Sequence, residues 1–229
     1  MWAILPVKDM TNAKTRLSDV LYQNERHDFF HAMLTDVLGA VCATPLLEGV
    51  AIITKDKEAQ ELARHHNIDF ILENENNGQT TAVSRAISWL KTKNITTVMQ
   101  IPGDIPLTTP TELISVIESH RLAPSMSIVP ARDKRGSNCV ICSPPDVIKL
   151  NFGNNSFIPH LHAAKQAGIR PTISSLPGIG LDIDTPDDLK AFLQKPSDTH
   201  SYKFLVKSGI AKRCQAINSG TTSSVGESI

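Results

Sequence analysis

Three aspartates in this sequence stand where a metal-assisted reaction would need them. Asp104 follows an apolar run at 96–101 and a Pro-Gly pair, and open α/β sheets bind ligands at the carboxyl ends of such buried strands. Asp182 and Asp184 are two residues apart, so in an extended segment their side chains point to the same face. Carboxylate oxygens suit Mg²⁺ that bridges substrate phosphates. We therefore predict a metal site made by Asp104, Asp182 and Asp184.

Each of these acids also has an ordinary structural explanation. Asp104 fits a turn at the end of a strand. Asp182 and Asp184 precede Thr185-Pro186, and acids are common near the N-cap of a helix. Spacing alone supports both interpretations equally, so the prediction depends on the three acids being brought together.

The second group of candidate residues is cationic. Lys8, Lys14 and Arg16 lie in the polar segment 8–17, directly after the apolar run 3–7, where α/β folds place phosphates. A nucleoside triphosphate needs cations that bind its oxygens and neutralise the leaving pyrophosphate. With Asp104, these three are our candidate catalytic residues. Charge alone would favour a solvated basic loop, and the segment lacks the GxxxxGK(S/T) motif of P-loop enzymes.

Small-residue loops form the third group. Gly-Ser-Asn at 136–138 and Gly-Asn-Asn-Ser at 153–156 offer N–H donors that can bind a carboxylate or phosphate. Each is an ordinary turn when taken alone. By contrast, His160 and His162 fall in an expected helix and would not share a face, and Cys139-x-x-Cys142 lies in an expected strand, where the two face opposite sides.

Composition limits the class of protein. The chain has 229 residues, 41% hydrophobic and 20% charged, with 23 basic and 23 acidic side chains, which fits one globular domain, or one domain and a tail, without a polyanion-binding surface. No run approaches the roughly 18 apolar residues of a membrane span, and the N-terminus does not resemble a signal peptide. We expect a cytoplasmic protein with small-molecule substrates and no nucleic-acid or membrane partner, and we allow for a homodimer.

Apolar periodicity predicts the elements that position these residues. Strands are expected at 3–7, 50–54, 68–72 and 96–101, and helices at 29–41, 58–66, 82–90 and from 109. Their alternation calls for a parallel sheet with right-handed crossovers. The expected fold class is α/β: a three-layer α/β/α sandwich with a mainly parallel central sheet and a small antiparallel excursion.

The pattern changes after residue 120. Runs at 125–131 and 138–142 predict a hairpin on the rim of the sheet, followed by a helix at 157–167, strands at 170–176 and 180–184, and a helix from 185 to 193. From 195 onward the periodicity is lost, although 202–206 would suit a short edge strand. We expect one domain at 1–194 and a flexible C-terminal tail at 195–229.

Four motifs in one order carry a resemblance to a known family. LPVK at 5–8, AKTRL at 13–17, GDIPL at 103–107 and LDIDTP at 181–186 together resemble the guanylyltransferases that make the deazaflavin coenzyme F-420. The resemblance runs from about residue 2 to 193. It implies the nucleotide-diphospho-sugar transferase fold.

The resemblance also implies an activity and a set of site residues. It implies Mg-dependent transfer of GMP from GTP to the phosphate of phosphoenolpyruvate, 2-phospho-L-lactate or 3-phospho-D-glycerate, with release of pyrophosphate and with two Mg²⁺ ions as cofactor. The nucleotide-binding residues are then Leu5, Pro6, Val7, Lys8, Glu73, Gly78, Gln79, Thr80, Pro102 and Gly103. The acceptor-binding residues are Gly136, Ser137, Asn138, Gly153 and Ser156.

One departure from the family pattern leaves base specificity open. Where the family usually has Gly-Leu-Asn, this chain has Gly78-Gln79-Thr80, and a hydroxyl cannot replace the paired donor and acceptor of an amide. A cytidylyltransferase or molybdopterin guanylyltransferase of the same fold is one alternative, which the LPVK motif disfavours because those enzymes carry a Gly-rich Arg loop there. A catalytically inactive nucleotide-binding regulatory domain is the other, which the three retained acids disfavour. The sequence does not choose among the three acceptor acids.

Overall fold

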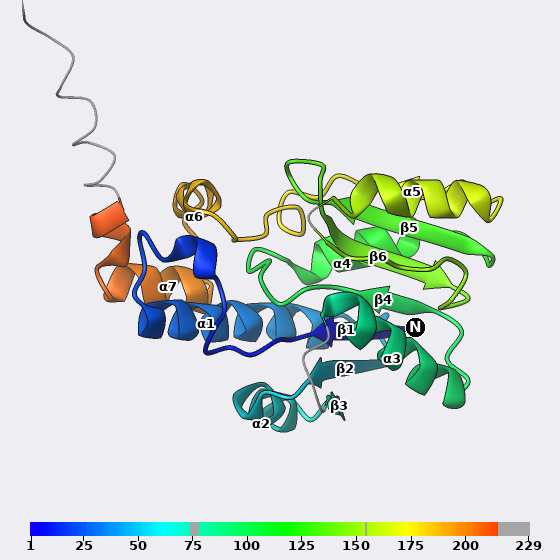
Figure 1. Ribbon diagram of the computed structural model, residues 1–229, viewed down its shortest axis with the longest axis horizontal. Coiled ribbons are helices and arrows are strands. Elements are labelled where there is room, and N and C mark those ends of the chain that lie inside the picture. Colours follow the sequence, from blue (N-terminus) through cyan, green and yellow to red (C-terminus); the bar gives the residue numbers. More distant parts are fainter. Residues whose placement is uncertain (74–77, 154, 215–229) are drawn as a thin grey trace, which may run out of the picture.

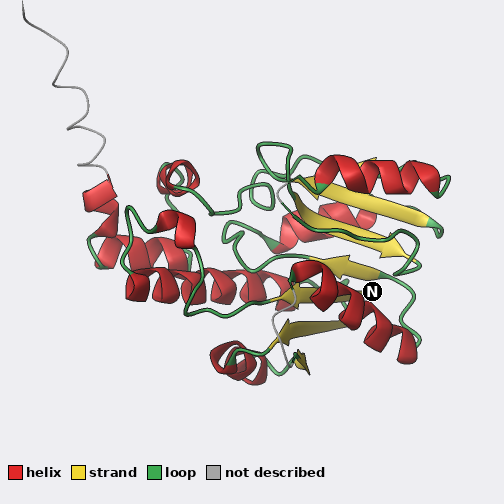
Figure 2. Ribbon diagram, viewed as in Figure 1, coloured by secondary structure: helices red, strands yellow, loops and turns green. Residues whose placement is uncertain are grey.

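In the computed structural model, which describes residues 1–73, 78–153 and 155–214, the strands form one seven-stranded sheet in the order β3-β2-β1-β4-β6-β5-β7. Helices cover both of its faces (Figure 1, Figure 2). The strands are β1 (Trp2–Pro6), β2 (Gly49–Thr54), β3 (Asp69–Leu72), β4 (Val98–Gln100), β5 (Ser125–Pro130), β6 (Ser137–Ser143) and β7 (Thr172–Ile173). The helices are α1 (Gln23–Cys42), α2 (Lys57–His65), α3 (Gln79–Thr92), α4 (Pro110–Glu118), α5 (Phe157–Gln166), α6 (Pro186–Leu193) and α7 (His200–Lys207), and a 3-10 turn spans Thr15–Leu17.

The predicted fold class is confirmed. β3, β2, β1 and β4 are mutually parallel, and β5 pairs in parallel with β7. Only β6 runs the other way, against both of its neighbours. The hairpin of β5 and β6 was expected on the rim, and this was wrong: β6 lies inside the sheet between β4 and β5. The reason is burial, since every residue of β6 is buried and a strand without a polar face belongs inside a sheet.

Side chains of successive strand residues supply two apolar cores on opposite faces of the sheet. In β1, Ala3 and Leu5 enter the core under α1, α2, α4, α6 and α7, whereas Ile4 enters the core under α3 and α5. Cys139 and Cys142 of β6 divide in the same way, as their spacing predicted. None of the helices in the described residues has both the length and the apolar character needed to cross a membrane.

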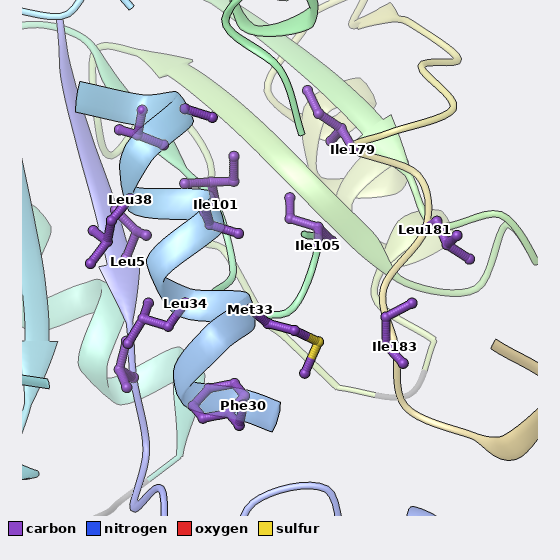
Figure 3. Packing of buried hydrophobic residues seen from close by; sticks show 14 of the residues in the cluster. Leu5, Phe30, Met33, Leu34, Leu38, Ile101, Ile105, Ile179, Leu181 and Ile183 are labelled. Carbon is purple, nitrogen blue, oxygen red and sulfur yellow. The ribbon is translucent and has the colours of Figure 1, made fainter. Parts of the chain in front are cut away.

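The first of these cores anchors the acidic segments (Figure 3). Ile105, directly after Asp104, and Leu181 and Ile183, on either side of Asp182, are buried to within 2% of full burial. All three belong to the cluster that contains the α1 side chains. Their burial leaves the intervening carboxylates at the margin of the core rather than inside it.

The two strands predicted after α5 are largely absent. The prediction of 170–176 shrinks to β7, and 180–184 is not a strand. The second segment crosses the edge of the sheet and has two backbone hydrogen bonds to distant parts of the described chain. The Ile183 N–H donates to the Asp104 carbonyl oxygen at 3.0 Å, and the Gly180 carbonyl oxygen accepts from the Arg132 N–H at 2.7 Å. Its apolar side chains, rather than a hydrogen-bond ladder, hold it in place.

The expected flexible tail is also wrong for residues 195–214. Residues 200–207 form α7, not an edge strand, and α7 lies alongside α1 (Figure 1). The Asp36 carboxylate on α1 accepts hydrogen bonds from the N–H groups of His200 at 2.7 Å and Ser201 at 2.9 Å, at the N-terminus of α7. This side-chain partner comes from a residue far away in the sequence, so the local pattern could not reveal it. The rest of the predicted tail, 215–229, lies outside the described residues.

Candidate active site

A cleft of about 880 Å³ opens at the carboxyl ends of β1, β3 and β4. The turn between β5 and β6 lines another side of the cleft. This turn lies at the carboxyl end of β5, which runs parallel to β4 and therefore ends at the same edge of the sheet. The volume is that of a site for small molecules. The predicted residues that line it are Pro6, Val7, Lys8, Lys14, Arg16, Glu73, Gly78, Gln79, Pro102, Gly103, Asp104, Gly136, Ser137, Asn138, Gly153, Ser156, Asp182 and Asp184.

Two predicted residues lie outside this lining. Leu5 has no exposed surface and is part of the apolar core, so its predicted contact with a nucleotide is wrong. The Thr80 hydroxyl accepts a hydrogen bond from the Phe152 N–H at 2.9 Å. Thr80 therefore ties α3 to the 152–156 loop rather than facing the cleft. Residues 74–77, between the predicted nucleotide-binding residues Glu73 and Gly78, and Asn154 of the 153–156 loop lie outside the described residues.

Lys14 joins the cationic segment to the acidic one. Its Nζ lies 2.6 Å from Asp104 Oδ2 and 2.6 Å from Asp184 Oδ1. Burial by itself would lower the pKa of Lys14, but the two carboxylates outweigh burial and raise it, so the ammonium stays charged. The backbone of Lys14 is left-handed, with φ of 55°, which is uncommon for a residue with a side chain. The chain thus accepts local strain and places this cation between the two acids.

Asp182 lies close enough to Asp104 and Asp184 to be affected by their charges. Burial, together with the charge of Asp104, raises the pKa of Asp182 to about 6. The Asn138 amide donates a hydrogen bond to Asp182 Oδ1 at 3.1 Å and another to the Ile179 carbonyl oxygen at 2.9 Å. Asn138, predicted to bind the acceptor, therefore orients an acid at the margin of the cleft.

The predicted metal site is not assembled as a ligand set. In the described chain, no group of three or more His, Cys, Asp or Glu side chains is arranged to hold a metal ion. Lys14 takes the position between Asp104 and Asp184 instead. Asp104 Oδ1 is buried and has no hydrogen-bond partner among the described residues. The site thus retains one free carboxylate oxygen that a cation could satisfy.

A glycine precedes Asp104 where the chain passes close to a side chain of α1. A Cβ on Gly103 would lie 2.9 Å from Leu34 Cδ1 of α1, closer than packed carbon atoms normally approach. Because α1 packs directly beneath this turn, Gly103 allows the end of β4 to stay close to the core while Asp104 reaches the cleft.

Sequence reasoning missed a carboxylate that fixes the 178–184 segment. Glu112 in the first turn of α4 accepts hydrogen bonds from the N–H groups of Gly178 at 2.8 Å and Ile179 at 3.0 Å. A Cβ on Gly178 would lie 2.2 Å from the Leu107 carbonyl oxygen, so only glycine fits there. An acid in the first turn of a helix has an ordinary local role, and nothing in the sequence indicated that Glu112 has a partner 66 residues away.

Two arginines of the β5–β6 turn also line the cleft and were not predicted. Arg132 reaches Asp188 at 2.8 Å, and Arg135 is mostly exposed. The other oxygen of Asp188 accepts from the Thr185 N–H at 3.0 Å, at the start of α6. The signal was present as two arginines in a short turn, but the hairpin that contains the turn was expected on the rim of the sheet instead of beside the cleft.

Comparison with known proteins gives a consistent result. A family model described as "Guanylyl transferase CofC like" matches residues 1–223. A phosphoenolpyruvate guanylyltransferase of Conexibacter woesei is 35% identical over 191 residues, which is 83% of this chain and 86% of that one. A 2-phospho-L-lactate guanylyltransferase of Methanobrevibacter ruminantium is 29% identical over 221 residues, 92% of each chain.

Solved structures agree on the fold. A protein of Desulfovibrio desulfuricans G20, provisionally described as a nucleotide-diphospho-sugar transferase, superposes with a TM-score of 0.71 at 17% identity, covering 93% of this chain and 97% of that one. A 4-diphosphocytidyl-2C-methyl-D-erythritol synthase superposes with a TM-score of 0.60 at 11% identity, covering 83% and 96%. At these identities the likeness concerns the fold alone. The family model and the sequence relatives go further: this chain is a nucleotidyltransferase that belongs to the CofC-like guanylyl transferase family.

Proposed function

We propose that this protein transfers GMP from GTP to the phosphate of a three-carbon phosphorylated acid and releases pyrophosphate, in coenzyme F-420 biosynthesis. The observation that carries the proposal is the Asp104–Lys14–Asp184 cluster, which lies in one cleft with the small-residue loops predicted to bind the acceptor. The printed names of the relatives supply the two acceptors that they support, phosphoenolpyruvate and 2-phospho-L-lactate. 3-Phospho-D-glycerate stays a prediction from the sequence.

The residues of the cleft suggest how this chain would assist the reaction. An oxygen of the acceptor phosphate attacks the α-phosphorus of GTP, and the bond to the bridging oxygen breaks as pyrophosphate leaves. The attacking oxygen is already anionic, so the reaction needs positioning and charge neutralisation more than a general base. Lys8, Lys14 and Arg16 line the cleft after β1, where they would bind the triphosphate and stabilise the charge that develops on it.

The acids fit a divalent cation. Asp104, Asp182 and Asp184 offer only oxygen donors, which Mg²⁺ prefers, and Asp104 Oδ1 has no partner among the described residues. Asp104, Asp182 and Asp184 would hold the ion, whose charge would offset that of the substrate phosphates. In this proposal Lys14 is the counter-ion of Asp104 and Asp184 in the free protein and binds phosphate in the complex. A cytoplasmic location and a homodimer also stay predictions.

Pyrophosphate release tests the proposal. The protein is incubated with Mg²⁺, one nucleoside triphosphate and one of the three acids, and the expected result is release with GTP and with at least one acid. Asp104→Asn should fold normally and lose most turnover, about 100-fold or more. Asp187→Asn is the matched control because Asp187 is an exposed acid close to Asp184. Release of pyrophosphate with CTP but not with GTP would contradict the proposal. Full turnover in Asp104→Asn would also contradict it.

A further inference from the structure

A buried chain of hydrogen bonds ends at Ser137, one of the serines that line the cleft. His160 of α5 is 1% exposed, Ser156 4% and Ser137 7%. The Asn151 N–H donates to His160 Nε2 at 3.0 Å, and His160 Nδ1 lies 2.9 Å from Ser137 Oγ. Ser156 Oγ donates to Ser137 Oγ at 3.2 Å.

The backbone N–H of Asn151 decides how protons are arranged along this chain. A backbone N–H can only donate, so His160 Nε2 must accept and cannot carry a proton. Burial lowers the pKa of His160 to about 4, so the ring is neutral near neutral pH and its proton resides on Nδ1. His160 Nδ1–H then donates to Ser137 Oγ, which already accepts from Ser156.

Ser137 Oγ therefore accepts two hydrogen bonds, one from His160 and one from Ser156. A hydroxyl oxygen has two lone pairs and one proton, and in this arrangement both lone pairs are used. What remains is the Ser137 proton, and Ser137 lines the cleft. Ser137 can then bind an oxygen that only accepts, such as one of a carboxylate or a phosphate, and it disfavours a ligand group that must donate.

The surroundings of Ser137 also favour an anion. Ser156 is the N-cap of α5, whose N-terminus carries partial positive charge. Arg135, next but one to Ser137 in the chain, lines the same cleft. These observations concern the helix and the turn, so they are independent of the hydrogen-bond chain.

We propose that His160 is a positioning residue that fixes Ser137 as a hydrogen-bond donor to an anionic oxygen of the acceptor acid. This inference rests on the proposed function for the identity of the acceptor, and it adds a residue that does not line the cleft. A purely structural role is the competing explanation, because the His160 ring also packs against Phe152, with ring centroids 5.0 Å apart.

Steady-state kinetics separate the two roles. His160→Phe keeps a ring and removes both hydrogen bonds, whereas His160→Gln keeps one donor and one acceptor. His160→Phe should raise KM for the acceptor acid by about tenfold or more, the effect of losing a hydrogen bond to a charged group, with KM for GTP and kcat nearly unchanged. His160→Gln should recover most of this loss. His162→Phe is the matched control, because His162 is exposed on the same helix.

A double-mutant cycle tests the connection to Ser137. Ser137→Ala should reproduce the KM effect, and adding His160→Phe to it should change KM little further, since both substitutions remove the same interaction. Comparing the acceptor acid with its carboxylate methyl ester identifies the anion. If Ser137 binds the carboxylate, the penalty for the ester shrinks in Ser137→Ala; if it binds the phosphate, the penalty is unchanged.

Nitrogen-15 NMR of the His160 ring gives a readout that does not depend on turnover. The expected spectrum has a protonated Nδ1 and an unprotonated Nε2. A protonated Nε2, an unchanged acceptor KM in His160→Phe, or equal rises in both KM values would overturn the inference while leaving the transferase proposal standing. If the wild-type protein releases no pyrophosphate with any of the acids, the proposed function itself fails.

Discussion

At the scale of single residues, Lys14 is the side chain on which the charge balance of the cleft depends. It is an ammonium held between two carboxylates, with only 5% of its side chain exposed. Removing one member of a buried ionic group leaves uncompensated charge, which costs more than the interaction itself contributes. The same carboxylates are the proposed metal ligands, so the lysine and a cation would compete for them.

This competition gives a prediction for Lys14→Met. In Mg²⁺-free buffer we expect the free energy of unfolding to fall by about 2 kcal/mol, less than for a fully buried group because the Asp184 side chain is 44% exposed. Added Mg²⁺ should then raise the Tm of the variant more than that of the wild type. Thermal unfolding with EDTA and with Mg²⁺ measures both effects. Lys207→Met, at an exposed position, is the control, and equal stability of Lys14→Met and wild type without Mg²⁺ would refute the explanation.

His160 predicts a dependence of stability on pH. Burial lowers its pKa to about 4 in the folded protein from the ordinary value of 6.5, so between these values the unfolded chain binds the proton and the folded one does not. Stability contributed by neutral His160 is present above pH 6.5 and is lost as pH falls toward 4, because protonation then favours unfolding.

Denaturant titration of wild type and His160→Phe at several pH values checks this. The wild type should lose more unfolding free energy on acidification than the variant, by at most a few kcal/mol. The pKa of His120 is also lowered by burial, so the difference between the two proteins, rather than the wild-type curve, isolates His160. Parallel curves for the two proteins would show that His160 does not contribute.

At the scale of elements, the position of the acids depends on α4. Glu112 binds two consecutive backbone N–H groups of the 178–184 segment, and Leu181 and Ile183 secure the same segment in the core. The Glu112 hydrogen bonds are polar and directional, whereas the burial of Leu181 and Ile183 is apolar and non-directional. Together they hold Asp182 and Asp184 without a strand ladder.

Glu112→Gln should therefore weaken the site as well as the fold. The amide keeps one acceptor oxygen and turns its NH₂ toward a backbone donor, so we expect the free energy of unfolding to fall by about 1–3 kcal/mol and turnover to fall with it. Glu118→Gln, an exposed position on the same helix, should have almost no effect. Denaturant unfolding measures the stability, and pyrophosphate release measures the turnover. A stable, fully active Glu112→Gln would show that the hydrogen bonds from Gly178 and Ile179 to Glu112 do not hold the 178–184 segment in place.

At the scale of the whole molecule, the C-terminal helix is part of the domain core. Leu205 of α7 and Ile210, three residues beyond its end, are fully buried and belong to the same cluster as the α1 side chains. The Phe204 ring of α7 stacks on Phe29 of α1 with centroids 6.4 Å apart. The family model also extends past α7, to residue 223.

Adjacent residues of α7 supply a matched pair for this conclusion. Leu205→Ala should reduce the free energy of unfolding by about 2–5 kcal/mol because it leaves a cavity in the core. Val206→Ala, at a position that is 50% exposed, should change it by about 0.5 kcal/mol or less. Chemical denaturation measures both, and similar small effects would mean that α7 does not stabilise the domain.

The sequence by itself determined the order of the elements as far as α5 and most of the residues that line the cleft. Apolar periodicity is a local property, so α1 to α4, the parallel half of the sheet and the helix start at Thr109-Pro110 could be predicted from neighbouring residues. The acids and cations were found because their positions relative to strand ends are also local. Their spacing suited turn and helix-cap residues equally well, and it is the folded chain that brings Asp104, Asp182 and Asp184 to one cleft.

Tertiary structure alone decided which groups face each other. The partners of Lys14, Glu112, Asp36 and His160 lie far from them in sequence or depend on a turn whose side of the sheet was unknown. β6 lies inside the sheet with every residue buried, and the turn that precedes it places Arg132 and Arg135 at the cleft. Hydrogen bonds and ion pairs act over a few ångströms in space, so they become visible only when the chain has brought their members together.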